Sequence, residues 1–184
     1  MEWDKQSETS QKIGYKTIVD KIYRLPNDHK AVYTTWGIVG GNNAAVVALT
    51  PDNQVVIARQ FRPGPEKIFD ELPGGGVDQG EEPIAAAARE LLEETGYASD
   101  EPLESIGVAY RDAYSNETNH YYVARNCRQI NSEQNLDEGE LVDICLIDVD
   151  TLLSNAKQGK MSDAVAVLMA YDTLKLLQEG QPNA

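Results

Sequence analysis

The chain has few cysteines and no long apolar run. Its 184 residues include only two cysteines, Cys127 and Cys145, which lie in separate segments without the spacing of metal ligands. We expect them to be reduced, buried thiols. No apolar run approaches the roughly 18 residues of a membrane-spanning helix, and the polar first residues lack the charged-then-apolar order of a signal peptide. These absences predict a soluble protein of the cytoplasm that does not bind membranes.

Basic residues are also scarce. The chain has 16 Lys and Arg against 30 Asp and Glu, which gives a formal net charge of −14 at pH 7. Nonspecific binding to a phosphate backbone needs a basic surplus that displaces its counterions. The composition therefore argues against nucleic acid as a partner. A phosphate-bearing ligand of this protein is expected to be small and bridged by metal.

No internal repeat or low-complexity linker interrupts the chain, and strand and helix signals alternate along it. A chain of 184 residues with 41% hydrophobic residues is long enough for one domain with a substantial core. The alternation indicates a mixed α/β fold.

Strand signals are clearest around two turn-like segments. Residues 15–23 and 31–39 carry β-branched and aromatic residues on either side of a Pro-Asn-Asp turn, which predicts an N-terminal antiparallel hairpin. Residues 44–50 and 54–61 flank a second such turn and predict a second hairpin. Further strands are expected at residues 105–110, 119–125 and 140–148.

A C-terminal helix is expected over residues 162–178. Ser162 is its predicted N-cap. Its predicted core face consists of apolar residues at helical spacing, Val165, Leu168, Tyr171 and Leu174.

Another helix is predicted between Pro83 and Gly96. Proline suits the first helical turn, where its missing N–H is not needed, and glycine suits the left-handed position after the last turn. The residues expected to pack against the core share one side of this helix; they are Ile84, Ala88, Leu91 and Thr95.

The opposite side of this helix carries three carboxylates. Glu90, Glu93 and Glu94 project within an arc of roughly 100°. Like charges at these spacings repel, so the cluster favours a bound cation, and magnesium prefers carboxylate oxygens. Arg89 lies one turn before Glu93 and could orient it by a bidentate contact. The alternative is a solvated acidic helix face.

Residues 75–97 resemble the Nudix box, Gly-x5-Glu-x7-Arg-Glu-aliphatic-x-Glu-Glu-x-Gly-aliphatic. Every charged and glycine position is filled, and Tyr97 replaces the last aliphatic residue. The resemblance implies the Nudix fold, an α/β/α sandwich with a mixed sheet, here with the added N-terminal hairpin. It also implies a metal-dependent hydrolase of nucleoside diphosphates linked to a second moiety. Magnesium is the implied cofactor, with manganese as an alternative.

Two segments outside the box resemble one branch of the family, the ADP-ribose pyrophosphatases and related nucleoside diphosphate sugar hydrolases. They are residues 55–62, which end in Gln-Phe-Arg, and residues 71–75, Glu-Leu-Pro-Gly-Gly. The resemblance places Arg62 and Glu71 in the substrate cleft. An ordinary ion pair on a sheet is the alternative for these two residues.

The same resemblance implies the metal ligands. They are the Gly74 carbonyl and the carboxylates of Glu90, Glu93 and Glu94. The implied catalytic residues of the box are Glu93 and Arg89.

An acidic loop at residues 135–140 resembles the loop that brings in the general base in this branch. Glu138 and Glu140 are both candidates, because a mobile loop can carry a base to the attacking water. A solvated acidic loop is the alternative. His29 and His120 neighbour no other motif and are read as structural or surface residues.

The substrate is less well defined. The branch usually has a proline about fifteen residues beyond the box, but this chain has none from Leu103 to Gln181. ADP-ribose is therefore expected as a substrate, giving AMP and ribose 5-phosphate, with room for others such as GDP-mannose. Arg111 could contact the terminal sugar or its phosphate. Alternatives are dinucleoside polyphosphates, NADH, nucleoside triphosphates, coenzyme A, or a catalytically silent nucleotide sensor.

Family resemblance further implies a homodimer. The predicted division is an N-terminal strand region, residues 1–40, which forms the dimer contact, and a Nudix hydrolase domain, residues 41–184. Trp36 and Tyr23, from the strand region, could stack on a nucleotide base, although aromatic residues in strands often simply pack.

Overall fold

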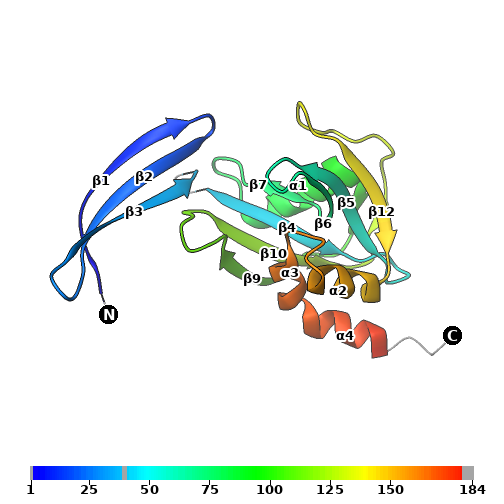
Figure 1. Ribbon diagram of the computed structural model, residues 1–184. Coiled ribbons are helices and arrows are strands. Elements are labelled where there is room, and N and C mark those ends of the chain that lie inside the picture. The colour runs from blue at the N-terminus through cyan, green and yellow to red at the C-terminus, as the bar shows by residue number, and fades with distance from the viewer. Residues whose placement is uncertain (1, 39–40, 180–184) are drawn as a thin grey trace. The chain divides into compact units, whose positions relative to one another are not determined.

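The computed structural model describes residues 2–38 and 41–179 and divides into two compact units, each described here by itself. The first unit comprises Met1–Asn42 and Ala109–Asn119, and the second comprises Asn43–Val108 and His120–Ala184. Figure 1 shows the elements of both units with their labels.

The first unit contains a three-stranded antiparallel sheet in the order β1-β2-β3. Its strands are β1 (Asp4–Ile13), β2 (Lys16–Arg24) and β3 (Lys30–Gly37). The predicted N-terminal hairpin is confirmed as β2 and β3, although its last predicted residue, Val39, lies outside the described residues, as does residue 40 at the predicted domain boundary. Strand β1 was not predicted from the sequence, because every residue of this polar strand is exposed and no apolar alternation marks it.

The second unit is built on two main sheets. One has the strand order β7-β4-β10-β9 and the other has the order β12-β5-β6. The strands of the first are β4 (Asn42–Ala48), β7 (Gly74–Gly76), β9 (Glu104–Tyr110) and β10 (Thr118–Ala124). Those of the second are β5 (Val55–Arg62), β6 (Lys67–Glu71) and β12 (Val142–Ile147). A small ladder joins β8 (Tyr97–Ala98) and β11 (Arg128–Gln129).

The prediction of a second hairpin is wrong. The predicted strands exist as β4 and β5, and a tight turn joins them, with Asn53 N donating to Thr50 O at 2.9 Å. The two strands nevertheless lie in different sheets and share only an isolated bridge between Leu49 and Val55. The apolar run that starts β5 is fully buried, and β5 fills the centre of its sheet by pairing with β12 and β6 instead.

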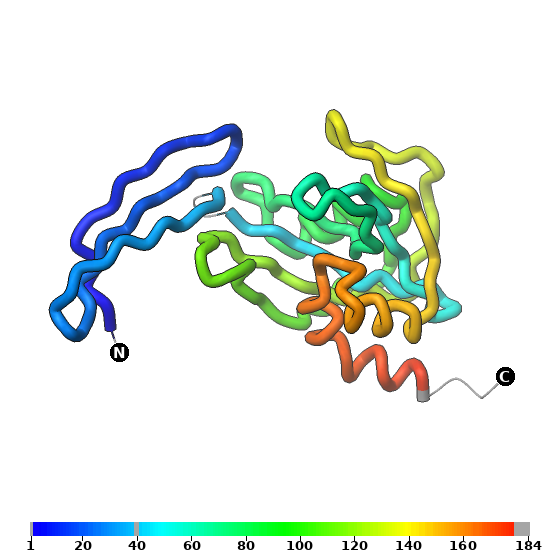
Figure 2. The backbone as a smooth tube through the Cα atoms, viewed as in Figure 1, coloured from blue at the N-terminus to red at the C-terminus, as the bar shows by residue number. Residues whose placement is uncertain are grey.

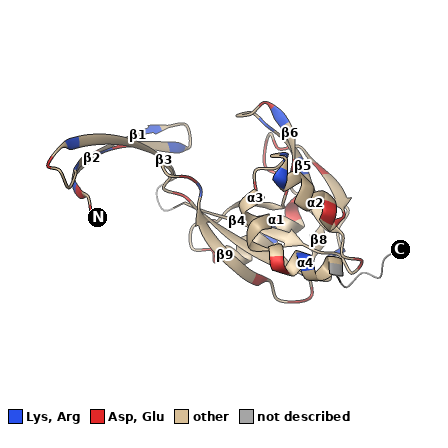
Figure 3. Cartoon of the chain, turned by 60° about the horizontal axis from the view of Figure 1, so that its bottom comes forward, with Lys and Arg blue, Asp and Glu red and all other residues tan. Residues whose placement is uncertain are grey.

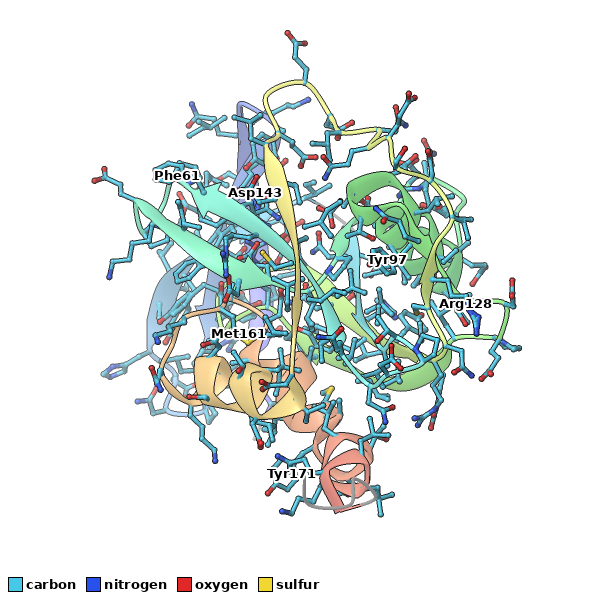
Figure 4. The ribbon with its side chains drawn as sticks, turned by 90° about the vertical axis from the view of Figure 1, so that its right-hand side faces the viewer. Phe61, Tyr97, Arg128, Asp143, Met161 and Tyr171 are labelled. Atoms are coloured by element: carbon cyan, nitrogen blue, oxygen red, sulfur yellow. The ribbon has the colours of Figure 1, made fainter. Side chains whose placement is uncertain are left out.

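Within its described residues, four helices cover the sheets of the second unit: α1 (Pro83–Thr95), α2 (Val149–Lys157), α3 (Ala164–Met169) and α4 (Tyr171–Glu179). Figures 1 and 4 show α1 on the opposite side of the strands from α2, α3 and α4. The predicted α/β class is therefore confirmed. No helix in the described ranges is long and apolar enough to cross a membrane.

The predicted core face of α1 is half right. Leu91 and Thr95 are buried, whereas Ile84 and Ala88 are exposed. The helix instead turns small residues toward the sheet at its N-terminal half, where the side chains of Ala86 and Ala87 join the core. Alanine permits this close approach because it has almost no side chain to accommodate.

The predicted C-terminal helix is two short helices. Helix α3 ends at Met169, and helix α4 starts at Tyr171. The N-cap residue of α3 is Asp163 rather than Ser162. The break changes which residues face inward, so Leu168 and Tyr171 are exposed while Leu174 is fully buried as predicted. Val165 is exposed too. In Figure 4 Tyr171 lies on the outer helix, away from the buried Met161.

Candidate active site

Helix α1 begins and ends where the sequence predicts. Pro83 occupies the first turn, and Gly96 adopts the left-handed conformation with φ 70° while its N–H donates to Leu92 O at 2.8 Å. A Cβ at position 96 would run into the backbone carbonyl of Asn131. Two separate constraints therefore require glycine at this position: the left-handed backbone angle and the close approach of the Asn131 backbone.

Arg89 organises the acidic face of α1. Its Nε and Nη2 bind the two carboxylate oxygens of Glu81 at 3.0 and 3.1 Å. Its Nη1 binds Glu90 and Glu93, each at 2.9 Å, and its Nη2 donates to Gly76 O at 3.0 Å. The bidentate partner is thus Glu81 rather than Glu93, which Arg89 contacts through one nitrogen. Hydrogen bonding to Glu81 is the main reason why the pKa of Arg89 lies above its usual value.

Glu94 is the most deeply buried carboxylate of the helix, with 4% of its surface exposed. It accepts a hydrogen bond from Gly74 N at 2.9 Å. Burial raises the pKa of Glu94 to about 8, and the charges of Glu90 and Glu140 raise it further, against the lowering effect of the Gly74 hydrogen bond. A carboxylate in this position is stabilised in its charged form by a nearby cation.

Glu90 lies beside Glu94 on the same face. Burial is the main cause of its raised pKa, and the charges of Glu93 and Glu140 add to it, while Arg89 lowers it. A Cβ on Gly75 would collide with the Glu90 carboxylate. The glycine-rich strand β7 therefore allows the backbone to pass directly against this carboxylate.

The donor set fits a hard divalent cation. Among the described residues no three acidic, histidine or cysteine side chains are already gathered as a metal site, since Arg89 holds Glu90 and Glu93 and an amide holds Glu94. The three carboxylates still share one helix face, and two of them have raised pKa values. Magnesium binds such sites through one or two carboxylates, completed by water and substrate phosphate.

A cavity of about 320 Å³ adjoins this face. One wall comes from the strand and helix of the box, and the other comes from the start of the acidic loop. Its lining residues are Gly76, Asp78, Arg89, Glu90, Glu93, Asn135, Leu136 and Asp137. The cavity brings the predicted catalytic residues Arg89 and Glu93 together with the loop predicted to carry the base.

The acidic loop is exposed, as its polar sequence predicts. Both candidate bases, Glu138 and Glu140, have exposed side chains. The charge of Glu140 contributes to the raised pKa values of Glu90 and Glu94, so Glu140 lies within electrostatic range of both. The loop is tied to the helix through Asn135, whose N–H donates to Glu93 O at 2.9 Å.

Arg62 and Glu71 form an ion pair between adjacent strands of the β12-β5-β6 sheet. Arg62 Nε donates to Glu71 at 2.6 Å, and its Nη2 contacts the same carboxylate oxygen. Glu71 is 1% exposed, and its other oxygen accepts a hydrogen bond from Ser162 Oγ. Burial lowers the pKa of Arg62, but its hydrogen bond and ion pair with Glu71 raise it above the usual value, and the charges of Asp163 and Glu94 add to this rise. The guanidinium therefore lies within electrostatic range of the acidic helix face.

The surrounding strands carry further cations. Figure 3 shows basic residues on β5 and β6, and the sequences of the two strands give them as Arg59, Arg62 and Lys67. Arg59 is paired with Asp70 at 2.6 Å, and Asp70 also accepts from Asn155 at 2.9 Å.

The two remaining predicted substrate residues, Arg111 and Trp36, belong to the first unit. The Arg111 guanidinium carbon lies 5.4 Å from the centre of the Trp36 ring, and Lys16 Nζ lies 4.8 Å from it. Both cations bind the buried Glu117, at 2.8 Å for Arg111 and 3.2 Å for Lys16. Tyr23 packs edge-on against Trp3 instead, with ring centres 5.9 Å apart.

Sequence reasoning gave no role to several residues that organise these clusters. Glu81 was recognised in the sequence as a residue of the box, but its bidentate contact with Arg89 was not predicted. Glu117, Gln134 and Ser162 carry no local motif, and each has at least one partner that lies 40 to 101 positions away. His29 lies in the exposed turn before β3, and His120 lies within β10.

The chain is similar to known proteins in sequence and in fold. A model of the NUDIX domain matches residues 40–168. A methanol dehydrogenase activator of Bacillus methanolicus is 35% identical over 124 residues, 67% of this chain and 67% of that protein. An ADP-ribose pyrophosphatase of Bacillus subtilis (strain 168) is 29% identical over 138 residues, 74% of this chain and 75% of that protein. The crystal structure of an ADP compounds hydrolase has the same fold, with a TM-score of 0.80 at 18% identity over 99% of this chain and 98% of that chain.

Proposed function

The chain belongs to the NUDIX family and is a pyrophosphohydrolase, and we propose that it hydrolyses the pyrophosphate bond of nucleoside diphosphate sugars with divalent metal ions. The observation that carries this proposal is the acidic face of α1. There the buried Glu94, with its raised pKa, lies in electrostatic range of Glu90 and of the cationic Arg62. Such a face favours a cation and, through it, a diphosphate.

In this proposal Glu90, Glu93 and Glu94 hold the metal, together with the Gly74 carbonyl. Magnesium is the expected ion and manganese the alternative. Once bound, the metal neutralises the diphosphate and lowers the pKa of a bound water. Arg89 aligns Glu90 and Glu93 through its Nη1 and is itself fixed by the bidentate contact with Glu81.

Arg62 is proposed to bind a phosphate of the substrate. Glu71 holds the guanidinium from its Nε side, and Ser162 holds Glu71. A planar guanidinium fixed in this manner is suited to phosphate oxygens. The charge of Glu94 on Arg62 supports a substrate contact over the ordinary ion pair that the sequence left open as the alternative.

Glu140 is proposed as the general base, in preference to Glu138. Its charge raises the pKa of both Glu90 and Glu94, which supports its choice as the group that accepts a proton from the attacking water. Glu138 lies two residues earlier on the exposed loop.

ADP-ribose is the proposed first substrate, giving AMP and ribose 5-phosphate. The similarity to an ADP-ribose pyrophosphatase supports this choice. The absence of proline from Leu103 to Gln181 leaves GDP-mannose as a further proposed substrate. Arg111 and Trp36 are proposed to contact the sugar phosphate and the base in a homodimer formed through the N-terminal strands. The cytoplasm is the proposed location.

A second candidate function follows from the relative named as a methanol dehydrogenase activator. In this alternative the protein acts on a dehydrogenase. NADH, one of the alternative substrates that the sequence left open, is then the molecule that it hydrolyses. A catalytically silent nucleotide sensor is a weaker candidate, because all carboxylates of the box are present.

A substrate panel separates these functions. The purified protein is assayed with ADP-ribose, GDP-mannose, UDP-glucose, NADH, diadenosine polyphosphates and nucleoside triphosphates, with magnesium, manganese or EDTA. The proposal predicts metal-dependent cleavage that is fastest for a nucleoside diphosphate sugar. Fastest cleavage of NADH favours the second candidate. Tight nucleotide binding without cleavage favours the sensor and contradicts the proposal.

A further inference from the structure

The loop that carries Glu140 has few contacts of its own. All of residues 135–141 except the half-buried Leu136 are exposed, and Figure 2 shows this segment in yellow, standing out from the body of its unit. Within the loop, Glu140 N donates to Asp137 O at 3.0 Å, which closes a local turn. Such a turn gives the loop a shape but does not fix its position, which is therefore set where the loop joins the rest of the unit.

The entrance of the loop is attached to the last turn of α1. The final carbonyls of a helix have no partner within the helix and need one from outside. Here Gly96 O accepts from Ile130 N and Asn131 N at 2.9 and 3.2 Å, and Glu93 O accepts from Asn135 N at 2.9 Å. Residues 130–135 therefore form the C-terminal cap of the helix that carries the proposed metal ligands.

One side chain joins this cap to the exit of the loop. The Nε2 of Gln134 donates to Glu94 O at 2.5 Å and to Val142 O at 3.1 Å. A side-chain amide nitrogen has two hydrogens, so it can satisfy both carbonyls together. Glu94 belongs to the acidic face, and Val142 is the first residue of β12, two residues after Glu140. Gln134 thus connects the backbone of a proposed metal ligand to the strand that follows the proposed base.

We propose that Gln134 is a positioning residue that holds the Glu140 loop at a fixed distance from the Glu94 carboxylate. This inference rests on the proposed function, in which Glu140 is the base and Glu94 a metal ligand. Gln134 touches neither substrate nor metal in this proposal. Its effect on catalysis passes through Glu140, because small displacements of a catalytic group lower the rate more than they lower binding.

Replacing Gln134 leaves no hole in the core, because the residue is exposed. Gln134→Met keeps much of the length of the side chain and removes both donors. We expect kcat for ADP-ribose to fall about tenfold, with KM and the magnesium dependence changed less than about twofold. Gln158→Met is the matched control, since Gln158 is an exposed glutamine of similar kind whose Nε2 bonds Ser154 on α2 at 2.8 Å. It is expected to match the wild type.

A double-mutant cycle with Glu140→Gln separates positioning from a merely structural role. If Gln134 acts through Glu140, Gln134→Met has no further effect on the residual single-turnover rate of Glu140→Gln. Losses that multiply in the double variant, or an unchanged kcat in a folded Gln134→Met protein, overturn the proposal. If Gln134→Met does not fold, Gln134→Asn, which keeps an amide on a shorter chain, is measured in the same cycle with the same criteria.

Failure of the proposed function is distinguishable from failure of this inference. A wild-type protein without metal-dependent hydrolysis refutes the function. A wild type that hydrolyses ADP-ribose while Glu140→Gln retains full activity refutes the assignment of the base, and with it the positioning role of Gln134.

Discussion

Glu94 is a buried carboxylate with a raised pKa, and this predicts a particular dependence of stability on pH. Burial raises its pKa to about 8 in the folded protein, above the ordinary value of 4.5 in the unfolded chain. The folded state therefore binds the proton more tightly. The stability that this provides is fully present below the unfolded pKa and is lost as pH rises through about 8.

The test is thermal unfolding of the EDTA-treated protein between pH 5 and pH 9. The wild type should lose more stability over this range than Glu94→Gln, which cannot ionise. Added magnesium should reduce the loss, because metal stabilises the charged form. Parallel curves for the two proteins without metal would show that Glu94 is not a buried, raised-pKa carboxylate.

Ser162 gives a second prediction at the residue scale. Its hydroxyl supplies a hydrogen bond to the buried Glu71, which also binds Arg62. Ser162→Ala leaves one oxygen of a buried carboxylate without this donor, so the free energy of unfolding should fall by about 1 to 2 kcal/mol in urea titrations. Ser132→Ala, at an exposed position, is the control and should change stability by less than about 0.5 kcal/mol. Equal effects of the two substitutions would contradict the role given to Ser162.

Single residues were predictable where a local spacing carries the chemistry. Glu90, Glu93, Glu94 and Arg89 follow from helical periodicity, and the structure places all four on α1. Ser162 was predicted to cap a helix and instead bonds Glu71, 91 positions away. No local pattern distinguishes a serine that caps a helix from one that reaches a buried carboxylate across the fold.

At the scale of elements, two glycines that follow helices can be compared, Gly96 after α1 and Gly159 after α2. Gly96 and Gly159 both have positive φ, 70° and 66°. A Cβ at Gly96 would meet the Asn131 carbonyl, whereas a Cβ at Gly159 would meet nothing within 4 Å. Gly159→Ala should therefore cost about 1 kcal/mol for the left-handed backbone alone.

Gly96→Ala should cost that amount and about 1 to 3 kcal/mol more, because the cap formed by residues 130–135 must shift. Chemical denaturation of both variants measures the difference. Equal losses of stability would mean that the cap moves freely, and would weaken the argument that it fixes the acidic loop.

Helices and strands were predicted well where one of their faces is apolar. They were predicted poorly where the pairing between strands determines the structure. Strands β4 and β5 were recognised, but their apolar runs contain nothing that specifies the partner strand, and the predicted hairpin is wrong. The exposed strand β1 was missed because hydrogen bonds to β2 stabilise it, not burial. Helices α3 and α4 were merged because no proline or glycine marks the break at Ala170.

At the scale of the whole molecule, the exposed sheet of the first unit bears on the oligomeric state. Every residue of β1 is exposed, and Val19 is the one apolar residue of the described strands β1 to β3 that is buried. A sheet with so little core gains stability by packing on another surface. We predict a homodimer that depends on this sheet.

Sedimentation velocity tests this prediction. The wild type should sediment as one species with twice the 20.3 kDa mass of the chain across micromolar concentrations. The double variant Val32→Lys, Ile22→Lys, which places charges at a facing pair of this sheet, should shift the species toward the monomer. A wild type that is monomeric throughout would contradict the dimer.

The most direct test of the proposed function is the dependence of ADP-ribose hydrolysis on magnesium in the wild type and in Glu94→Gln. The variant keeps the size of the side chain and removes its charge. We predict that its kcat/KM at saturating magnesium falls at least about a hundredfold while its circular dichroism spectrum is unchanged. Unchanged activity of Glu94→Gln at saturating magnesium would contradict the assignment of the acidic face of α1 as the metal site.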